Sequence, residues 1–199
     1  MLSPVQSLLK RTFDLVFAFL GIIIFSWLIL LAWLAASIDT RSNGFFIQTR
    51  IGQFGRLFKV VKIKTMRPVK GTDTTVTKRG DPRITKLGAF FRKTKIDELP
   101  QLWNVLIGQM SFVGPRPDVP GYADQLDGEQ RKVLQLKPGI TGPATLKYRN
   151  EEDLLAQAED PQKFNDEVIF PDKVRVNIEY MESWSFSKDL KYIVETVVG

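Results

Sequence analysis

The sequence of 199 residues contains neither histidine nor cysteine. These two absences exclude a Ser-His-Asp triad and a Cys-His nucleophile pair, the usual zinc sites, thiolate redox chemistry and disulfide bonds. Any catalysis must therefore use carboxylates, hydroxyls, lysine, tyrosine or a metal ion held by oxygen. The length suits one compact domain with additions, and the 44% hydrophobic content is typical of a globular protein rather than a disordered one.

Charge is absent from residues 15–38, where LVFAFLGIIIFSWLILLAWLAASI runs for 24 positions without a charged side chain. A helix of this length spans about 36 Å, which is enough for the ~30 Å hydrocarbon core of a bilayer. The run is longer than the roughly 7–15 apolar residues of a signal peptide, and no A-x-A-like cleavage site ends it. We therefore expect residues 1–40 to form a membrane-anchoring helix; a helix buried in the protein core is the alternative.

The sequence indicates the topology of this anchor less firmly than it indicates the anchor itself. Gly21 and Ser26 interrupt its middle with a poor helix former and a hydroxyl that competes for backbone hydrogen bonds. Basic residues, Arg11 before the run and Arg41 after it, are compatible with two ends on the cytoplasmic side. These features favour a re-entrant helix that turns back within the membrane, while periodicity alone leaves a spanning helix open.

The basic side chains are concentrated immediately after the anchor. Residues 39–70 carry eight of them against a single acid, net +7, whereas residues 117–199 have a net charge of −6. Basic residues beside a membrane segment are retained in the cytoplasm and attracted to anionic headgroups. We therefore place residues 41–199 on the cytoplasmic side of the membrane, in contact with membrane lipid. A charge run is often only a solvated surface, but this density next to an anchor predicts anionic partners.

The most informative segment contains an acidic pair, Asp97 and Glu98, followed by an amphipathic helix that ends at Gly108. We expect Asp97 to be the helix N-cap, so that both carboxylates lie among free backbone N–H groups. Arg92 lies five residues upstream, and Arg116 lies between two prolines that fix its backbone. Acids with converging cations, and no histidine, indicate phosphoryl chemistry with Mg²⁺ bridging carboxylate and phosphates.

Four motifs carry a family resemblance: KIKTM at 62–66, DPRITKLGAFFRKTKIDELPQLWNVL at 81–106, GQMSFVGPRP at 108–117 and KPGITG at 137–142. With the hydrophobic N-terminus, they cover nearly the whole chain, which resembles the bacterial sugar transferase family, the monotopic phosphoglycosyl transferases. The resemblance implies an α+β, helix-rich fold in which a membrane helix, 1–40, precedes a cytoplasmic catalytic domain, 41–199.

The resemblance also implies a reaction, the first membrane step of glycoconjugate or polysaccharide synthesis. A sugar phosphate would pass from a nucleotide sugar donor, usually a UDP-sugar, to a polyprenyl phosphate acceptor such as undecaprenyl phosphate. Asp97 would be the nucleophile that forms an aspartyl phosphosugar, and Glu98 its partner in the dyad and a ligand of Mg²⁺. Lys64, Arg92 and Arg116 match phosphate-binding positions, and Arg11 and Ser26 match positions of the re-entrant helix.

Two departures from the family pattern limit this assignment. Where many small members have Ser-Pro in the membrane helix, this chain has Ser26-Trp27, so the break is less strongly encoded. After KPGITG the chain continues with Pro143-Ala144-Thr145, and no sugar-binding residue is assigned there.

The acidic C-terminal part is less specific. Residues 151–160 predict a short exposed helix with solvated carboxylates. The apolar spacing from Ser187 predicts an amphipathic helix that either packs on the domain or lies in the membrane interface. A membrane-tethered basic module that binds anionic lipid or nucleic acid without catalysis is the alternative function, but it gives no role to the acidic pair, and we expect no nucleic acid partner. The oligomeric state is left open.

Overall fold

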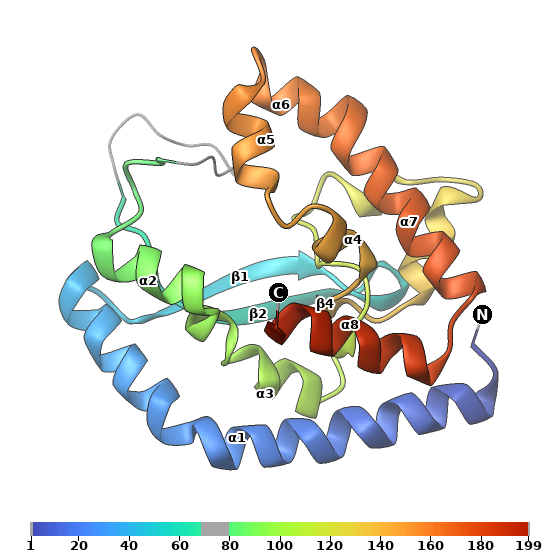
Figure 1. Ribbon diagram of the computed structural model, residues 1–199, viewed down its shortest axis with the longest axis horizontal. Helices are drawn as coiled ribbons and strands as arrows, with labels where there is room; N and C mark the ends of the chain where they lie inside the picture. Colours follow the sequence, from blue (N-terminus) through green and yellow to red (C-terminus); the bar gives the residue numbers. More distant parts are fainter. Residues whose placement is uncertain (1, 69–79, 199) are drawn as a thin grey trace.

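The computed structural model describes residues 2–68 and 80–198. Proline and glycine around a threonine-rich middle predict a loop over residues 67–83, and this loop lies mostly outside the described residues. The fold is α+β and rich in helix, as predicted (Figure 1). The helices are α1 (Pro4–Thr40), α2 (Lys86–Thr94), α3 (Gln101–Leu106), α4 (Pro143–Lys147), α5 (Glu151–Gln157), α6 (Pro161–Phe164), α7 (Phe170–Glu182) and α8 (Phe186–Val198). Short turns of 3₁₀ or π helix are η1 (Gln53–Gly55), η2 (Ile96–Glu98), η3 (Ala123–Gln125), η4 (Gln130–Gln135) and η5 (Asn165–Ile169).

Helix α1 is a single element of 37 residues that begins with a capping box at Ser3. Figure 1 shows it as a bent rod that runs along one side of the molecule and then turns along a second side. It is long and apolar enough to cross a membrane, and only 11% of its most apolar stretch is buried. Large side chains such as Trp27 and Leu30 are each 61% exposed. This exposure rules out the alternative of a buried core helix; the division at residue 40, where α1 ends, stays a prediction.

The inner side of the bend is lined by small residues, which let α1 approach the rest of the fold closely. Ala18, Ala32 and Ala36 are buried there, and a Cβ atom on Gly21 would lie 3.1 Å from the Leu102 side chain of α3. Because α1 rests on the folded domain along this side, its outer apolar side is the one left uncovered.

Polar contacts fix the first turns of α1 in place. Arg11 donates hydrogen bonds of 2.7 and 2.8 Å to the carbonyl oxygens of Val105 and Leu106, at the C-terminal end of α3. The last carbonyls of a helix lack the i+4 amides that would follow and carry the negative end of its dipole, so a cation is favourable there. Near the middle of α1, the Ser26 hydroxyl donates to the carbonyl of Ile23 over 3.0 Å, as expected for a hydroxyl that competes with the helix ladder. The re-entrant topology itself stays a prediction.

Two short sheets carry the loops of the site. Strand β1 (Phe45–Ile51) pairs antiparallel with β2 (Leu57–Ile63). The sequence from Phe45 to Met66 predicts two short extended segments around Gly52 and Gly55, and this pairing confirms them. Strand β3 (Ser111–Val113) pairs parallel with β4 (Gly139–Thr141). Thus the VGPRP and KPGITG motifs, distant in sequence, lie side by side.

Glycine is required at this junction for a steric reason. A Cβ atom on Gly139 would lie 2.2 Å from the amide nitrogen of Gly114, and one on Gly114 would lie 2.2 Å from the carbonyl oxygen of Lys137. The two backbones therefore approach to a distance that no side chain allows. Their contact holds the segment that follows Gly114 in a fixed position.

Helix α8 packs on the domain, which is one of the two arrangements that its sequence left open; contact with the membrane interface stays a prediction. Its Asp189 is 3% exposed and accepts hydrogen bonds from Lys10, Tyr180 and Trp184, which ties α8 to α1 and α7. In contrast, Val194 is 58% exposed. One side of α8 is thus packed on the domain, and apolar residues remain on the other.

Candidate active site

The acidic pair lies in the turn that joins α2 to α3. Lys95 adopts a left-handed conformation (φ 59°) that ends α2, and Asp97 and Glu98 follow in the 3₁₀ turn η2. The expectation that Asp97 is a helix N-cap is wrong. Helix α3 begins only at Gln101, with Pro100 at its N-cap position and no side-chain cap. Pro100 suits this position because proline fixes φ and has no N–H group that needs a partner. The Asp97 carboxylate is therefore not used for capping.

Glu98 is held by two cations from other parts of the chain. Its Oε1 atom lies 2.9 Å from the ammonium of Lys62 on β2 and 3.3 Å from the guanidinium of Arg116. Burial by itself would raise the pKa of Glu98, but these two charges, with that of Lys95, hold the pKa well below its ordinary range. Glu98 is therefore a permanently ionised carboxylate in a fixed position.

Asp97 has the opposite environment. The residue is 8% exposed, and its Oδ1 atom is buried without a hydrogen-bond partner among the described residues. Burial, reinforced by the neighbouring charge of Glu98, raises the pKa of Asp97 from 3.8 to about 6, while Lys62 and Arg92 oppose this rise. The result is a pair of adjacent carboxylates whose pKa values are pushed apart, an arrangement that assigns them different chemical roles.

Arg116 reaches the pair from a rigid segment. After β3, the Gly139 amide donates to the Pro115 carbonyl over 2.8 Å, and Arg50 of β1 donates to the Pro117 carbonyl over 3.0 Å. Burial, followed by the charge of Arg116, lowers the pKa of Arg50 to about 10. Arg116 itself keeps 45% of its side chain exposed, so it faces both Glu98 and solvent.

The other two predicted phosphate-binding residues do not contact the pair in this structure. The Lys64 ammonium donates to the Ser42 hydroxyl over 2.8 Å, beside the end of α1. Arg92 donates to Thr65 over 3.3 Å and forms an ion pair of 2.9 Å with Glu152. Arg92 still contributes its charge to the field at Asp97.

Two of the carboxylates predicted to be solvated on residues 151–160 also form ion pairs. Glu152 keeps 48% of its side chain exposed although it pairs with Arg92, whereas Glu151, with 28% exposed, lies 2.7 Å from the ammonium of Lys173 on α7. Long-range folding brings these acids against cations that the local sequence does not reveal. Glu151 and Glu152 stand at the start of α5, so they place the N-terminal end of this helix beside the site.

Lys62 is the site residue that reasoning from the sequence missed. It stands two positions before Lys64 in the same basic run, and the alternation of a strand places positions 62 and 64 on one face. That spacing allows either lysine to face the pair, and only the pairing of β2 with the rest of the fold selects Lys62. Arg50 was missed for the same reason, because its role depends on the contact between β1 and the Pro117 carbonyl.

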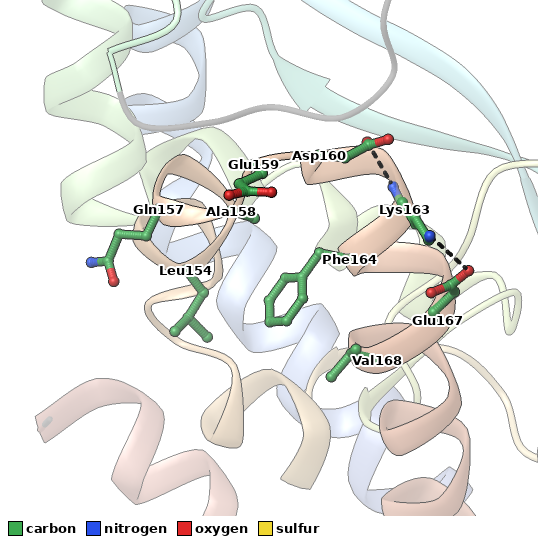
Figure 2. Close-up of a pocket in the computed structure, with 9 residues that line it drawn as sticks. All are labelled: Leu154, Gln157, Ala158, Glu159, Asp160, Lys163, Phe164, Glu167 and Val168. Carbon is green, nitrogen blue, oxygen red and sulfur yellow. Dashed lines mark hydrogen bonds and ion pairs between the residues drawn. The ribbon is translucent and has the colours of Figure 1, made fainter.

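A hollow elsewhere on the surface is separate from this site. Figure 2 shows it between α5 and the α6–η5 segment, with the Leu154, Phe164 and Val168 side chains at its base and the acids Glu159 and Glu167 at its rim. None of the predicted site residues lines it. The candidate site is therefore defined by its charged groups rather than by this hollow.

Comparison with known proteins identifies the family of this chain. The sequence profile of the family described as "Bacterial sugar transferase" matches residues 5–199. The chain is 36% identical over 193 residues to a UDP-glucose:undecaprenyl-phosphate glucose-1-phosphate transferase of Caulobacter vibrioides, an alignment that covers 94% of this chain and 68% of that protein. It is 37% identical to the Escherichia coli protein of the same name, over 98% of this chain and 41% of the relative. The Rhizobium meliloti exopolysaccharide production protein ExoY is 30% identical, over 98% and 86% of the two chains.

The chain belongs to the bacterial sugar transferase family, and it is thus an enzyme of the transferase class. The match extends over the anchor helix, the acidic pair and the C-terminal helices. Relatives differ in length, and the chain spans about two fifths of the Escherichia coli protein. A basic module without catalysis, the alternative considered from charge alone, is not favoured by this assignment.

Proposed function

We propose that this enzyme transfers a sugar 1-phosphate from a UDP-sugar to undecaprenyl phosphate, as the first membrane step of a polysaccharide or glycoconjugate synthesis. Two relatives are named for transfer of glucose 1-phosphate from UDP-glucose to undecaprenyl phosphate. The observation that carries the proposal is the asymmetry of the acidic pair. One carboxylate is neutralised by Lys62 and Arg116, and the other is buried and has an oxygen without a partner.

This asymmetry assigns the nucleophile. A carboxylate attacks with a lone pair that is not already engaged, and its basicity increases as its pKa rises. Asp97 has both properties, whereas the Glu98 oxygen that holds two cations has neither. Asp97 is therefore the nucleophile, and Glu98 organises the cations that receive the phosphates.

The proposed reaction has two steps. In the first, Asp97 Oδ1 forms a bond to the phosphorus that carries the sugar. The bond from this phosphorus to the nucleoside monophosphate breaks, and its electron pair leaves with the nucleotide. In the second, a phosphate oxygen of undecaprenyl phosphate attacks the same phosphorus, and the bond to Asp97 breaks to restore the carboxylate. Arg116 and Lys62 lie where they neutralise charge in both steps.

Mg²⁺ fits the donor set of this site. Lys62 and Arg116 both contact Oε1 of Glu98, and the described residues give Oε2 no hydrogen bond, so this oxygen is open to a cation. Mg²⁺ in proteins is commonly held by one or two carboxylates together with substrate phosphates and water. Glu98 would hold the ion, with Asp97 beside it. When bound, it would withdraw charge from the phosphates of the donor.

The membrane arrangement follows from α1. We propose that its exposed apolar side lies in the cytoplasmic leaflet and that both ends remain on the cytoplasmic side, where the basic block meets the acceptor headgroup. The absence of cysteine from the sequence allows a direct test. Single cysteines at Ser3 and Thr49 should react equally with an impermeant maleimide in inverted vesicles. A Ser3→Cys protein labelled only in intact spheroplasts would show a spanning helix instead.

The reaction is tested by supplying the donor alone. Wild-type protein in nanodiscs with Mg²⁺ and a panel of UDP-sugars should release about one UMP per enzyme and gain the mass of a sugar phosphate. Asp97→Asn should do neither, and Asp127→Asn, which changes an exposed acid, should behave as wild type. Turnover by Asp97→Asn above about one hundredth of the wild-type rate, or UMP release only after acceptor is added, would contradict the mechanism.

A further inference from the structure

Helix α3 contains two buried amide side chains with different surroundings. Asn104, 1% exposed, is fully engaged. It donates to the Lys59 carbonyl and to Gln109 Oε1, each over 2.8 Å, and accepts from the Val61 amide over 3.2 Å. Gln101, 2% exposed, has a buried Nε2 group without a hydrogen-bond partner in the described parts of the chain. Asn104 therefore has a structural role that Gln101 does not share.

A buried donor without a partner is costly and rare in folded proteins. Among the described residues, five buried side-chain donors or acceptors have no partner, and two of them, Asp97 Oδ1 and Gln101 Nε2, belong to residues four apart in the chain. Leu99 and Pro100, between them, have helical backbone angles, so little more than one helical turn separates the two residues. One atom is an acceptor and the other a donor, yet no hydrogen bond joins them. Both are thus available to a third group.

We propose that Gln101 is a catalytic residue, whose Nε2 group donates a hydrogen bond to a non-bridging oxygen of the transferred phosphoryl group. This inference rests on the proposed function, because it requires phosphorus to reach Asp97 Oδ1. As the Oδ1–phosphorus bond forms, the bond to the nucleoside monophosphate breaks and its electron pair leaves with the nucleotide. Gln101 exchanges no proton in this step. A fixed neutral donor in a buried site stabilises the charge on that oxygen without needing to reorganise.

The substitution Gln101→Met separates this role from a structural one. Methionine has a similar length and removes the buried donor, so the melting temperature should stay within about 1 °C of wild type or rise, since an unpaired polar group is lost. In the same protein, the rate of UMP release with donor alone should fall by about 10²-fold, as for other single donors to a developing charge. KM should change little, because the hydrogen bond is made to the group in transfer.

Two further variants complete the experiment. Gln101→Glu retains the shape but replaces the donor with an acceptor, so it should lose UMP release at least as strongly at pH 8. Gln157→Met, an exposed position on α5, is the matched control and should change neither quantity. A Gln101→Met protein with wild-type kcat, or one with a clearly lower melting temperature, would overturn the proposal. An active Asp97→Asn protein would overturn the proposed function instead, so the two failures are distinguishable.

Discussion

The substitution Asp97→Asn should make the folded protein more stable while it abolishes the reaction. Asp97 is buried beside a second carboxylate, and its Oδ1 atom lacks a hydrogen bond from any described residue. Folding therefore destabilises the ionised form of this side chain. Asparagine has nearly the same shape and no charge, so its burial does not lower the unfolding free energy in this way.

The magnitude follows from the pKa. A rise from 3.8 in the unfolded chain to about 6 in the folded protein corresponds to about 3 kcal/mol of unfolding free energy. The folded state binds this proton more tightly than the unfolded state does. The stability linked to the proton is therefore present below pH 4 and is lost as pH rises through about 6. The advantage of Asp97→Asn should be near zero at pH 4 and reach about 3 kcal/mol above pH 7.

Thermal unfolding in nanodiscs at a series of pH values provides the assay. For a chain of this length, about 3 kcal/mol corresponds to a rise in melting temperature of roughly 6–12 °C at pH 8. Asp127→Asn, at an exposed position, is the control and should show no difference that depends on pH. If Asp97→Asn were as stable as wild type, or less stable, at pH 8, the reasoning that burial and Glu98 destabilise the ionised Asp97 would be refuted.

Three other predictions concern the same site. Since Asp97 must be ionised to attack and its pKa is about 6, kcat/KM should fall about tenfold per pH unit below pH 6 and level off above pH 7; a flat profile from pH 5 to 8 would contradict its role. Lys62→Met leaves Glu98 with one cation and should cost about 3 kcal/mol in denaturant unfolding, whereas Lys59→Met, an exposed neighbour on β2, should cost little. Gly88→Ala would place a Cβ atom 2.0 Å from the Thr65 carbonyl oxygen. This substitution should lower the unfolding free energy by about 2–3 kcal/mol, although alanine usually stabilises a helix relative to glycine. A higher melting temperature for Gly88→Ala would disprove the close contact.

Local sequence patterns predicted the elements that depend on nearby residues. Thr85 stands just before the apolar spacing that begins at Leu87, which predicts an N-cap, and its hydroxyl caps α2 by accepting a hydrogen bond of 2.8 Å from the Gly88 amide. The apolar spacing after Ser187 predicted α8, and Gly52 and Gly55 marked the turn between β1 and β2. These signals succeed because capping, periodicity and turn formation act over a few residues.

The same reasoning failed where the local pattern fits two structures. An Asp followed by an apolar repeat is typical of an N-cap, but the left-handed Lys95 and Pro100 place Asp97 in a 3₁₀ turn ahead of the helix. Glu151 and Glu152 have Lys147 and Arg149 nearby in sequence, yet they pair with Lys173 and Arg92, and this pairing depends on how α5 meets α7 and α2.

The sequence by itself determined the class of chemistry. The lack of histidine and cysteine restricted the candidate catalytic groups to carboxylates, hydroxyls, lysine, tyrosine or a metal ion, and the uncharged run with its basic flank indicated an anchor beside an anionic partner. Only the tertiary structure shows that the two carboxylates have different environments, because that difference depends on which cations approach Glu98 and on the burial of Asp97. The charge, burial and hydrogen bonding around a single atom come from segments far apart in the chain, so a local sequence pattern does not predict them.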